Sequence, residues 1–426
     1  MDFFVITQGC KVNQFESQAI VKLLTERGHR LCSQASAASV VIINTCAVTA
    51  EASRKARQAV RRARSLCGDG IIAVCGCWSQ LDPGDAEQLG ADLVSGSGNR
   101  RGFVDELEEV FANNIKRHIF ERPVSWRTIE QLPAGAMPGH TRSMLKVQDG
   151  CANYCSYCII PYLRGPVRSL APADAAAQAA GLASLSTKEI VITGIELASY
   201  GLDLIGRPGM PSLLSEISKA APGVRLRLGS LEPRIITQEL CEALCDIQGL
   251  CAHFHLSLQS GCDATLRRMG RKYDTARFIQ SVDLLRKYFP HCGLTADLIV
   301  GFPGETEAEH KETMLFITRC AFSDMHIFPY SKRPGTPAAN MPGQVTSSVK
   351  RDRAREAAEI AEKMKESFLY SCIGSTQSVL FESGQTGHAE NYCEVEAPED
   401  GLEGLVLPVY VTGTNKGKLT GSILTD

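Results

Sequence analysis

Three closely spaced cysteines are the residues best suited to carry chemistry in this sequence. Cys151, Cys155 and Cys158 form a C-x3-C-x2-C run, and soft thiolates of this kind select zinc or an iron–sulfur cluster. Zinc needs a fourth ligand, whereas no cysteine or histidine follows closely after Cys158. Three thiolates on a 4Fe–4S cluster leave one iron open to a substrate or cofactor. The run therefore predicts a 4Fe–4S cluster with an open position.

A second set of cysteines is far apart in sequence but shares one position in the expected fold. Cys10, Cys46 and Cys77 each lie just after the end of a predicted parallel strand. The carboxyl ends of parallel strands meet at one edge of a sheet, which is where ligands bind. The three thiols could ligate a second cluster, or they could be buried thiols of the kind common at strand ends. Cys75 competes as the third ligand, but Cys77 is preferred because it lies in the loop beyond the strand.

Small and polar residues follow several strands of the expected central barrel. Gly301-Phe302-Pro303-Gly304-Glu305 follows its fifth strand, Thr193-Gly194 follows its second, and Ser257 and Gln259 lie at the end of its fourth. Active sites of such barrels lie at the C-terminal ends of the strands, on the rim that also carries the cysteine run. These residues could form the wall of a cofactor site, although each of them alone is better explained by a turn or packing position.

One predicted helix carries a stripe of arginines. Steps of three, four and three residues place Arg54, Arg57, Arg61 and Arg64 on one face, with few acidic residues expected to neutralise them. A charged helix face is usually just solvated. Next to a ligand-binding sheet edge, the stripe could instead bind nucleic-acid phosphates. Two lysines near the end of the chain could extend that surface, Lys416 and Lys418.

The first part of the chain alternates apolar runs with helical patterns, which predicts βαβ units. Strands are predicted at Phe3–Thr7, Val40–Asn44, Ile71–Val74 and Asp92–Ser95, and helices at Gln14–Glu26, Glu51–Ser65 and Gly102–Phe111. The fold class is therefore α/β, with a doubly wound parallel sheet over residues 1–122. Residues 123–140 are rich in proline and glycine and predict a linker.

The alternation resumes over residues 141–370. Six strands are predicted, at Ser143–Gln148, Glu189–Thr193, Val224–Leu228, His253–Leu258, Leu294–Val300 and Asp324–Phe328. Because a full barrel needs eight such units, we predict a partial, open (β/α)6 barrel, closed by a charged helix over Thr346–Tyr370. Residues 371–426 change character to short β-rich runs separated by glycines, which predict a small antiparallel β-barrel.

Composition excludes several classes of protein. A chain of 426 residues with a net charge of -2 is not a generally basic nucleic-acid coat. No apolar stretch approaches the ~20 residues that span a bilayer, and the N-terminus lacks the order of a signal peptide. We therefore expect a cytoplasmic protein with no membrane partner. Its 17 cysteines are expected to be thiols, and the ten outside the two sets and Cys75 to be structural.

Taken together, these features resemble the radical S-adenosylmethionine methylthiotransferases over nearly the whole chain. The resemblance rests on seven segments, Thr7–Gln14, Asn44–Thr49, Gly76–Gln80, Val147–Pro161, His255–Gly261, Asp297–Thr306 and Phe328–Pro337. It implies that a 4Fe–4S cluster on the C-x3-C-x2-C run cleaves S-adenosylmethionine to a 5′-deoxyadenosyl radical. It also implies a second 4Fe–4S cluster on the three strand-end cysteines, which delivers sulfur, and a second S-adenosylmethionine that supplies the methyl group.

Two segments narrow the resemblance to one branch of the family. Gly9–Gln14 and Ser230–Pro233 resemble the branch that inserts a methylthio group at carbon 2 of threonylcarbamoyladenosine, at tRNA position 37. Glu196 stands where this branch is expected to carry a histidine. The alternatives are a relative acting on isopentenyladenosine in tRNA or on a ribosomal-protein aspartate. A non-catalytic electron carrier would usually supply a fourth cysteine for each cluster.

The resemblance also implies partners and contact residues. The partners are a tRNA anticodon loop, held in part by a short TRAM-like C-terminal barrel, an electron donor and a sulfur source. No catalytic residue is expected beyond the cluster ligands. The residues expected to contact S-adenosylmethionine are Tyr157, Thr193, Gly194, Glu196, Ser257, Gln259, Asp297 and Gly301, and those expected to contact RNA are the four arginines of the stripe.

Overall fold

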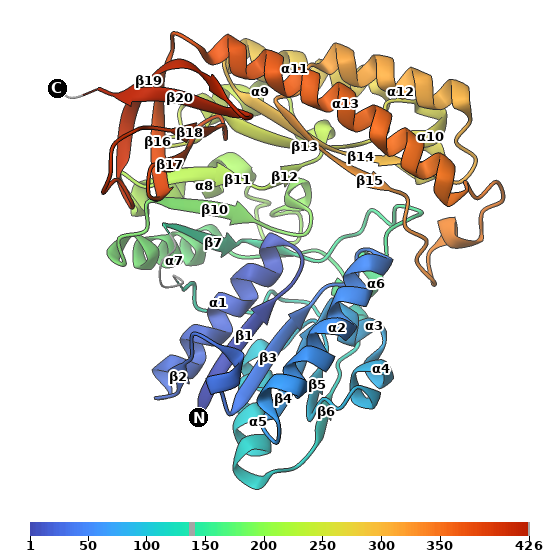
Figure 1. Cartoon of the computed structure of the whole chain (residues 1–426), viewed down its shortest axis with the longest axis vertical. Coiled ribbons are helices and arrows are strands. Elements are labelled where there is room, and N and C mark those ends of the chain that lie inside the picture. Colours follow the sequence, from blue (N-terminus) through green and yellow to red (C-terminus); the bar gives the residue numbers. More distant parts are fainter. Residues whose placement is uncertain (136–140, 425–426) are drawn as a thin grey trace.

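The structure, a computed structural model, describes residues 1–135 and 141–424. The end of the predicted linker, residues 136–140, and the last two residues of the predicted C-terminal barrel, 425–426, lie outside these ranges. Figure 1 shows an N-terminal α/β unit, a central barrel above it in this view, and a small β-barrel at one end of the central barrel.

The N-terminal unit is built on a six-stranded parallel sheet with the order β2-β1-β3-β4-β5-β6. Its strands are β1 (Asp2–Thr7), β2 (Arg30–Leu31), β3 (Val40–Thr45), β4 (Ile71–Gly76), β5 (Leu93–Ser95) and β6 (Arg117–Ile119). The predicted doubly wound parallel sheet is thereby confirmed. The sequence patterns missed β2 and β6, which are short edge strands without a continuous apolar run.

Helices cover both faces of this sheet. They are α1 (Lys11–Glu26), α2 (Ala50–Cys67), α3 (Cys77–Leu81), α4 (Pro83–Gln88) and α5 (Arg100–Asn113), with a 3-10 turn at Ala35–Ala37. Alternate side chains of β3 serve the two faces: Ile42 packs with Phe15 of α1, and Ile43 packs with Val60 of α2. A strand buried on both faces must be apolar throughout, which explains the continuous Val-Val-Ile-Ile run of β3.

The described part of the predicted linker is packed into the molecule. It begins with a 3-10 turn at Pro123–Ser125, and Trp126 stacks under the guanidinium of Arg168 at 5.1 Å. Leu132 and Ala134 are buried in the same core as the face of the sheet that α1 covers. The linker thus fixes the N-terminal unit against the barrel.

The central barrel consists of two neighbouring parallel sheets. β7 (Arg142–Lys146), β10 (Glu189–Thr193) and β11 (Arg225–Leu228) form the first, and β12 (Ser230–Leu231), β13 (His253–Gln259), β14 (Gly293–Val300) and β15 (Asp324–Pro329) form the second. The two sheets meet where the Cys251 amide donates to the Leu226 carbonyl at 2.8 Å. β8 (Gln148–Asp149) follows the first strand and pairs antiparallel with β9 (Arg168–Ser169). All six predicted barrel strands are present.

Helices and turns connect the barrel strands. The helices are α6 (Ile160–Arg164), α7 (Pro172–Ser184), α8 (Met210–Ala220), α9 (Gln238–Cys245), α10 (Asp263–Met269), α11 (Thr275–Tyr288), α12 (Glu307–Cys320) and α13 (Ser347–Cys372), with 3-10 turns at Leu197–Ser199, Pro233–Ile235 and Pro337–Asn340. α13 corresponds to the charged helix predicted over Thr346–Tyr370, and it runs beside β15 (Figure 1).

The C-terminal unit is a closed five-stranded barrel. Its strands are β16 (Thr376–Ser383), β17 (Thr386–Ala389), β18 (Glu394–Glu396), β19 (Val406–Asn415) and β20 (Lys418–Ile423), in the order β16-β17-β18-β20-β19. The prediction of a fully antiparallel barrel is wrong at one pair, because β18 and β20 are parallel. β19 lies between them in sequence, so β20 returns to β18 in the same direction.

The C-terminal barrel closes one end of the central barrel through buried charges. Arg142 Nε donates to Glu382 Oε1 at 2.6 Å, and Arg227 Nη1 donates to the Glu390 carbonyl at 2.9 Å. Tyr392, in the loop between β17 and β18, stacks on His253 of β13, with ring centroids 4.7 Å apart. The two barrels therefore share one polar interface.

Two of the ten cysteines expected to be structural, Cys372 and Cys393, lie together. A side-chain hydrogen bond from Cys393 lowers the pKa of Cys372, and Asn391 Nδ2 donates to Cys372 Sγ at 3.6 Å. No local sequence pattern indicates this pair, because it joins the end of α13 to the loop before β18. Among the described residues, no helix is both long enough and apolar enough to cross a bilayer.

Candidate active site

The C-x3-C-x2-C run lies in the loop after β8, at the C-terminal end of the barrel strands. The Cys151 amide donates to the Gly165 carbonyl at 3.1 Å, and the Cys158 amide to the Cys155 carbonyl at 2.9 Å. The Ser156 amide donates to the Met269 carbonyl at 2.9 Å, which ties the loop to the end of α10. These bonds hold all three thiols on the wall of one cavity.

The chemistry of these thiols fits an iron–sulfur cluster. Burial raises the pKa of Cys151 to about 11 and that of Cys158 to about 12. Arg271 Nη1 donates to Cys155 Sγ at 3.3 Å, so a guanidinium stands beside the trio. Thiols of this kind lose their protons when a metal binds. A cation beside them then stabilises the resulting negative charge.

The strand-end cysteines also converge in space. Cys10 precedes α1, Cys46 follows β3, and Cys77 is the first residue of α3. Burial, and then the neighbouring Cys77 thiol, raise the pKa of Cys46 to about 12. Burial likewise raises the pKa of Cys10, and Cys77 again contributes. The three thiols are therefore near neighbours.

Two glycines allow this convergence. Gly9 has φ +96, and a Cβ on it would lie 2.6 Å from the Cβ of Cys46. Gly76 has φ +107, and a Cβ on it would lie 2.4 Å from the Thr45 carbonyl oxygen. Only glycine fits both the backbone angle and the space at these positions. The loops that carry Cys10 and Cys77 can approach Cys46 for this reason.

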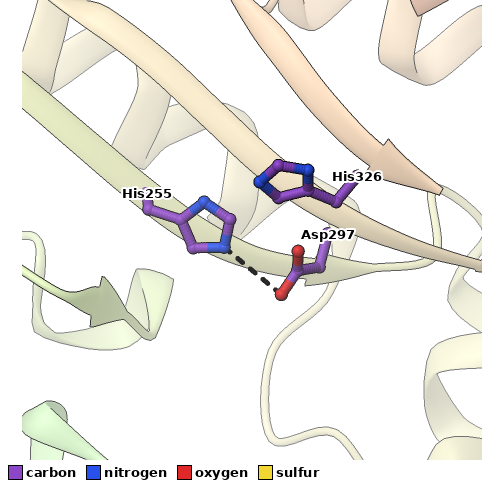
Figure 2. A group of neighbouring side chains, drawn as sticks. All are labelled: His255, Asp297 and His326. Atoms are coloured by element: carbon purple, nitrogen blue, oxygen red, sulfur yellow. Dashed lines mark ion pairs between the residues drawn. The ribbon is translucent and has the colours of Figure 1, made fainter. Parts of the chain in front are cut away.

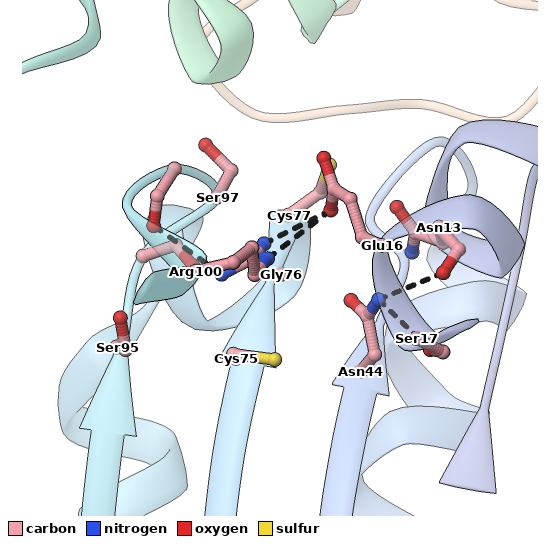
Figure 3. Close-up of polar contacts among 12 residues, drawn as sticks. Asn13, Glu16, Ser17, Asn44, Cys75, Gly76, Cys77, Ser95, Ser97 and Arg100 are labelled. Carbon is pink, nitrogen blue, oxygen red and sulfur yellow. Dashed lines mark hydrogen bonds and ion pairs between the residues drawn. The ribbon is translucent and has the colours of Figure 1, made fainter. Parts of the chain in front are cut away.

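Figure 3 distinguishes Cys77 from its competitor Cys75. Cys75 lies within β4, whereas Cys77 lies beyond the end of the strand. The Cys75 side chain belongs to the apolar core on the α1 side of the sheet. Arg164 Nε donates to Cys77 Sγ at 3.3 Å, so this trio also has a guanidinium at its side. The geometry favours Cys77 as the third member.

A buried ionic network joins the two cysteine sites. Glu16 of α1 pairs with Arg164, with Lys146 at 3.1 Å and with Arg100 at 3.1 Å. Burial alone would raise the pKa of Glu16, but Arg164 and Lys146 outweigh it and hold that pKa well below its ordinary range. Figure 3 shows Glu16 and Arg100 above the strand ends, with Asn13 and Asn44 beside them. The network locks the sheet edge against the barrel.

A cavity of about 610 Å³ lies between the two units. The N-terminal unit contributes Cys10, Lys11 and Val48 to its wall, and the barrel contributes all three cysteines of the run. Seven of the eight residues expected to contact S-adenosylmethionine also line it: Tyr157, Thr193, Gly194, Glu196, Ser257, Gln259 and Asp297. The sequence prediction thus brought together residues from β10, β13 and β14 and from the loops after β8 and β10.

Gly301 is the expected contact that the described structure does not bring to the cavity wall. It has φ +70, and its amide donates to the carboxylate of Glu305. A Cβ at this position would lie 2.4 Å from Cγ of Lys350. The loop needs glycine here for its turn and for packing.

One end of the cavity is acidic. Asn153 Nδ2 donates to the carboxylate of Glu196, and to Glu232 Oε2 at 3.3 Å. Burial, and then the neighbouring Glu232, raise the pKa of Glu196 to about 7. Arg234 Nη2 donates to Glu232 Oε2 at 2.9 Å, which leaves Glu232 ionised and Glu196 easy to protonate. Glu196 also lies close enough to Cys151 to raise the pKa of the Cys151 thiol.

The other end carries imidazoles and an ammonium. Figure 2 shows His255, Asp297 and His326 pointing toward one another from β13, β14 and β15. Their ligand atoms lie within 4.8 Å of one another, with His255 Nε2 at 3.2 Å from Asp297 Oδ2. Lys11 lines the same cavity, and burial lowers the pKa of its ammonium. Lys11, Arg271, His326, Arg164 and Glu16 are the site residues that pattern reasoning missed.

The arginine stripe is more neutralised than the sequence suggested. Arg54 pairs with Glu51 at 2.7 Å, and Arg57 and Arg64 pair with carboxylates brought in from α4 and the loop before β5, Asp85 and Asp92. The expectation of few neutralising acids is therefore wrong, because two of these acids are distant in sequence. Arg61 is exposed and has no ion-pair partner within the described residues.

Comparison with known proteins agrees with this geometry. The Radical SAM superfamily matches residues 145–317, and the family described as Uncharacterized protein family UPF0004 matches residues 2–96. A solved radical S-adenosylmethionine methyltransferase, TsrM from Kitasatospora setae, superposes with a TM-score of 0.59 at 14% identity, covering 79% of this chain and 74% of that one. Fold and match together define a radical S-adenosylmethionine enzyme, which implies a 4Fe–4S cluster and S-adenosylmethionine.

Relatives in sequence show which family of radical S-adenosylmethionine enzymes the chain belongs to. The threonylcarbamoyladenosine tRNA methylthiotransferase MtaB of Bacillus subtilis is 40% identical, over 91% of this chain and 88% of the relative. A tRNA-2-methylthio-N(6)-dimethylallyladenosine synthase of Pelotomaculum thermopropionicum is 30% identical, over 98% of this chain and 96% of the relative. The chain belongs to the MtaB methylthiotransferase family.

Proposed function

We propose that this chain inserts a methylthio group at carbon 2 of N6-threonylcarbamoyladenosine, next to the anticodon at tRNA position 37. The observation that carries the proposal is the shared cavity, because Cys10 approaches it from the sheet edge while the C-x3-C-x2-C run approaches it from the barrel. A reaction that needs both a radical and a sulfur donor requires two such sites to face one substrate.

In this proposal each cysteine trio holds its own 4Fe–4S cluster. When bound, the cluster on the barrel run supplies the electron that cleaves S-adenosylmethionine, and the one on Cys10, Cys46 and Cys77 supplies the sulfur. Arg271 and Arg164 stabilise the thiolates of the two trios. The cavity residues Tyr157, Thr193, Gly194, Glu196, Ser257, Gln259 and Asp297 orient S-adenosylmethionine and exclude water.

The RNA would reach the cavity with its modified base unstacked. Recognition of single-stranded loops generally requires such splayed bases. Two units would hold the anticodon stem and loop, one on either side of the barrel domain, residues 141–370. The first is the N-terminal unit, residues 1–122, with Arg61 and its neighbours on α2. The second is the TRAM-like unit, residues 371–426. An electron donor and a sulfur source complete the partners, and a tRNA substrate would place the reaction in the cytoplasm.

Purified, cluster-reconstituted protein tests the proposal directly. With reductant and S-adenosylmethionine, we expect 5′-deoxyadenosine and a 2-methylthio product from an anticodon stem-loop that carries threonylcarbamoyladenosine. A matched stem-loop that carries dimethylallyladenosine should stay unmodified. Product from the second RNA alone would assign the chain to the dimethylallyladenosine branch. Absence of 5′-deoxyadenosine would favour an electron carrier.

A further inference from the structure

The cavity is polarised, and its acidic end suits S-adenosylmethionine. Glu196 and Glu232 share Asn153 at the end of the cavity near Cys151. S-adenosylmethionine carries a sulfonium and an ammonium, and carboxylates stabilise both of these positive charges. Carboxylates also accept hydrogen bonds from the hydroxyls of its ribose. The opposite end is therefore left for the nucleoside that is to be modified.

That opposite end presents a cation without a partner. Lys11 is the first residue of α1 and lines the cavity beside Cys10. Within residues 1–135 and 141–424, its ammonium makes no hydrogen bond or ion pair. By contrast, the buried ammonium of Lys146 pairs with Glu16 at 3.1 Å and with Asp149 at 3.2 Å. A half-buried ammonium that lines a cavity and makes no ion pair within the described residues is suited to bind an anion.

The cluster of His255, Asp297 and His326 stands at the same end (Figure 2). Two imidazoles and a carboxylate could ligate a divalent metal. An ammonium beside them disfavours a metal ion, because like charges repel. His255 is already held, with Nδ1 2.9 Å from Thr295 Oγ1 and Nε2 3.2 Å from Asp297 Oδ2. His326 has no such partner within the described residues, so its ring is available to a ligand.

We propose that Lys11 and His326 bind the carboxylate of the threonylcarbamoyl group. This assignment rests on the proposed function, and it identifies the residues that would select threonylcarbamoyladenosine as the substrate. Threonylcarbamoyladenosine carries a carboxylate on its N6 substituent, whereas dimethylallyladenosine carries only an apolar chain there. An ammonium at this position therefore favours the first nucleoside and, left unpaired and desolvated, disfavours the second.

A comparison of two substrates on one enzyme tests this assignment. The first stem-loop carries threonylcarbamoyladenosine, and the second carries the same nucleoside with its carboxylate converted to a neutral carboxamide. For the unaltered chain we expect kcat/KM to be about 10–100-fold higher on the carboxylate RNA, mainly through KM, as for a charge-assisted contact. For Lys11→Met this ratio should fall close to 1, and Lys11→Arg should restore most of it.

The ratio separates binding from general damage, because loss of folded or cluster-loaded enzyme affects both substrates equally. Lys219→Met, at an exposed lysine of α8 paired with Glu216 at 3.7 Å, is the matched control and should keep the ratio. If Lys11→Met turns over neither RNA, fluorescence anisotropy gives the Kd of each RNA, and the ratio of the two Kd values replaces the ratio of kcat/KM. A ratio near 1 for the unaltered chain, or an unchanged ratio for Lys11→Met, would overturn the assignment. Failure of the unaltered chain on both RNAs would instead overturn the proposed function.

Discussion

Glu196 illustrates how one side chain acquires its charge from its surroundings. It lies in the loop after β10 and shares Asn153 with Glu232. Burial raises the pKa of the Glu196 carboxyl, and the neighbouring carboxylate of Glu232 raises it further. The family resemblance marked Glu196 as a departure from the expected histidine. The structure shows that the departure places a carboxyl with a pKa of about 7 at the acidic end of the cavity.

This pKa predicts a specific pH dependence. The ordinary value of 4.5 applies to the unfolded chain, so ionisation costs the folded state stability as pH rises from about 4.5 to about 7. Glu196→Gln removes this titration. The melting temperature of the cluster-free protein should therefore fall less between pH 5 and pH 8 for Glu196→Gln than for the unaltered chain. Parallel pH profiles would contradict the assignment, and Glu216→Gln on exposed α8 serves as the control.

At the scale of elements, Glu189 joins β10 to β11 and to the C-terminal barrel. Its carboxylate accepts from Arg227 Nε at 2.7 Å and pairs with Arg225 at 2.8 Å, and Arg227 continues to the Glu390 carbonyl. Burial opposes ionisation, but Arg227 and then Arg225 lower the pKa of Glu189 to about 2. The carboxylate of Glu189 thus links β10 and β11 to each other and, through Arg227, to the C-terminal barrel.

Removing this charge should destabilise the fold strongly. Glu189→Gln leaves Arg225 and Arg227 buried with only partial compensation, which costs about 3 kcal/mol or more. The contribution is fully present above the unfolded pKa near 4.5 and is lost as pH falls toward 2. Thermal melting should therefore show a large difference between Glu189→Gln and the unaltered chain at pH 7 and a smaller one at pH 3. A difference that does not depend on pH would contradict this reading.

Elements and site were predictable from sequence to different degrees. The apolar runs placed β3 and β4 to within two residues, because strands buried on both faces leave a continuous signal. Short edge strands such as β6 left none. The strand ends indicated that Cys10, Cys46 and Cys77 would converge, whereas the other trio was predicted from the spacing of the C-x3-C-x2-C run. By contrast, the pairing of Glu16 with Arg164 joins residues 148 positions apart, and no local pattern encodes such a contact.

At the scale of the whole molecule, the N-terminal unit and the barrel act as two halves of one site. The Glu16 network fixes their relative position, and Arg164 extends from the barrel to Cys77. The proposed division of labour assigns cofactor cleavage to the barrel and sulfur delivery to the sheet edge. It predicts that the two activities can be separated by mutation.

Cys46→Ala tests that separation. The substitution removes one thiol of the sheet-edge trio and leaves Cys151, Cys155 and Cys158 untouched. We expect 5′-deoxyadenosine formation to persist within about threefold, while methylthio product falls below detection, and iron content should fall to about half. Loss of both activities together would contradict the division of labour. Cys245→Ala, at an exposed thiol of α9, is the control for the loss of a cysteine.

The most direct measurement is nucleoside mass spectrometry of total tRNA from cells that lack this gene. The account predicts that 2-methylthio-threonylcarbamoyladenosine disappears and that threonylcarbamoyladenosine accumulates in its place, while 2-methylthio derivatives of dimethylallyladenosine stay unchanged. A plasmid that carries the intact gene should restore the product. Unchanged 2-methylthio-threonylcarbamoyladenosine in the deletion strain would contradict the central claim.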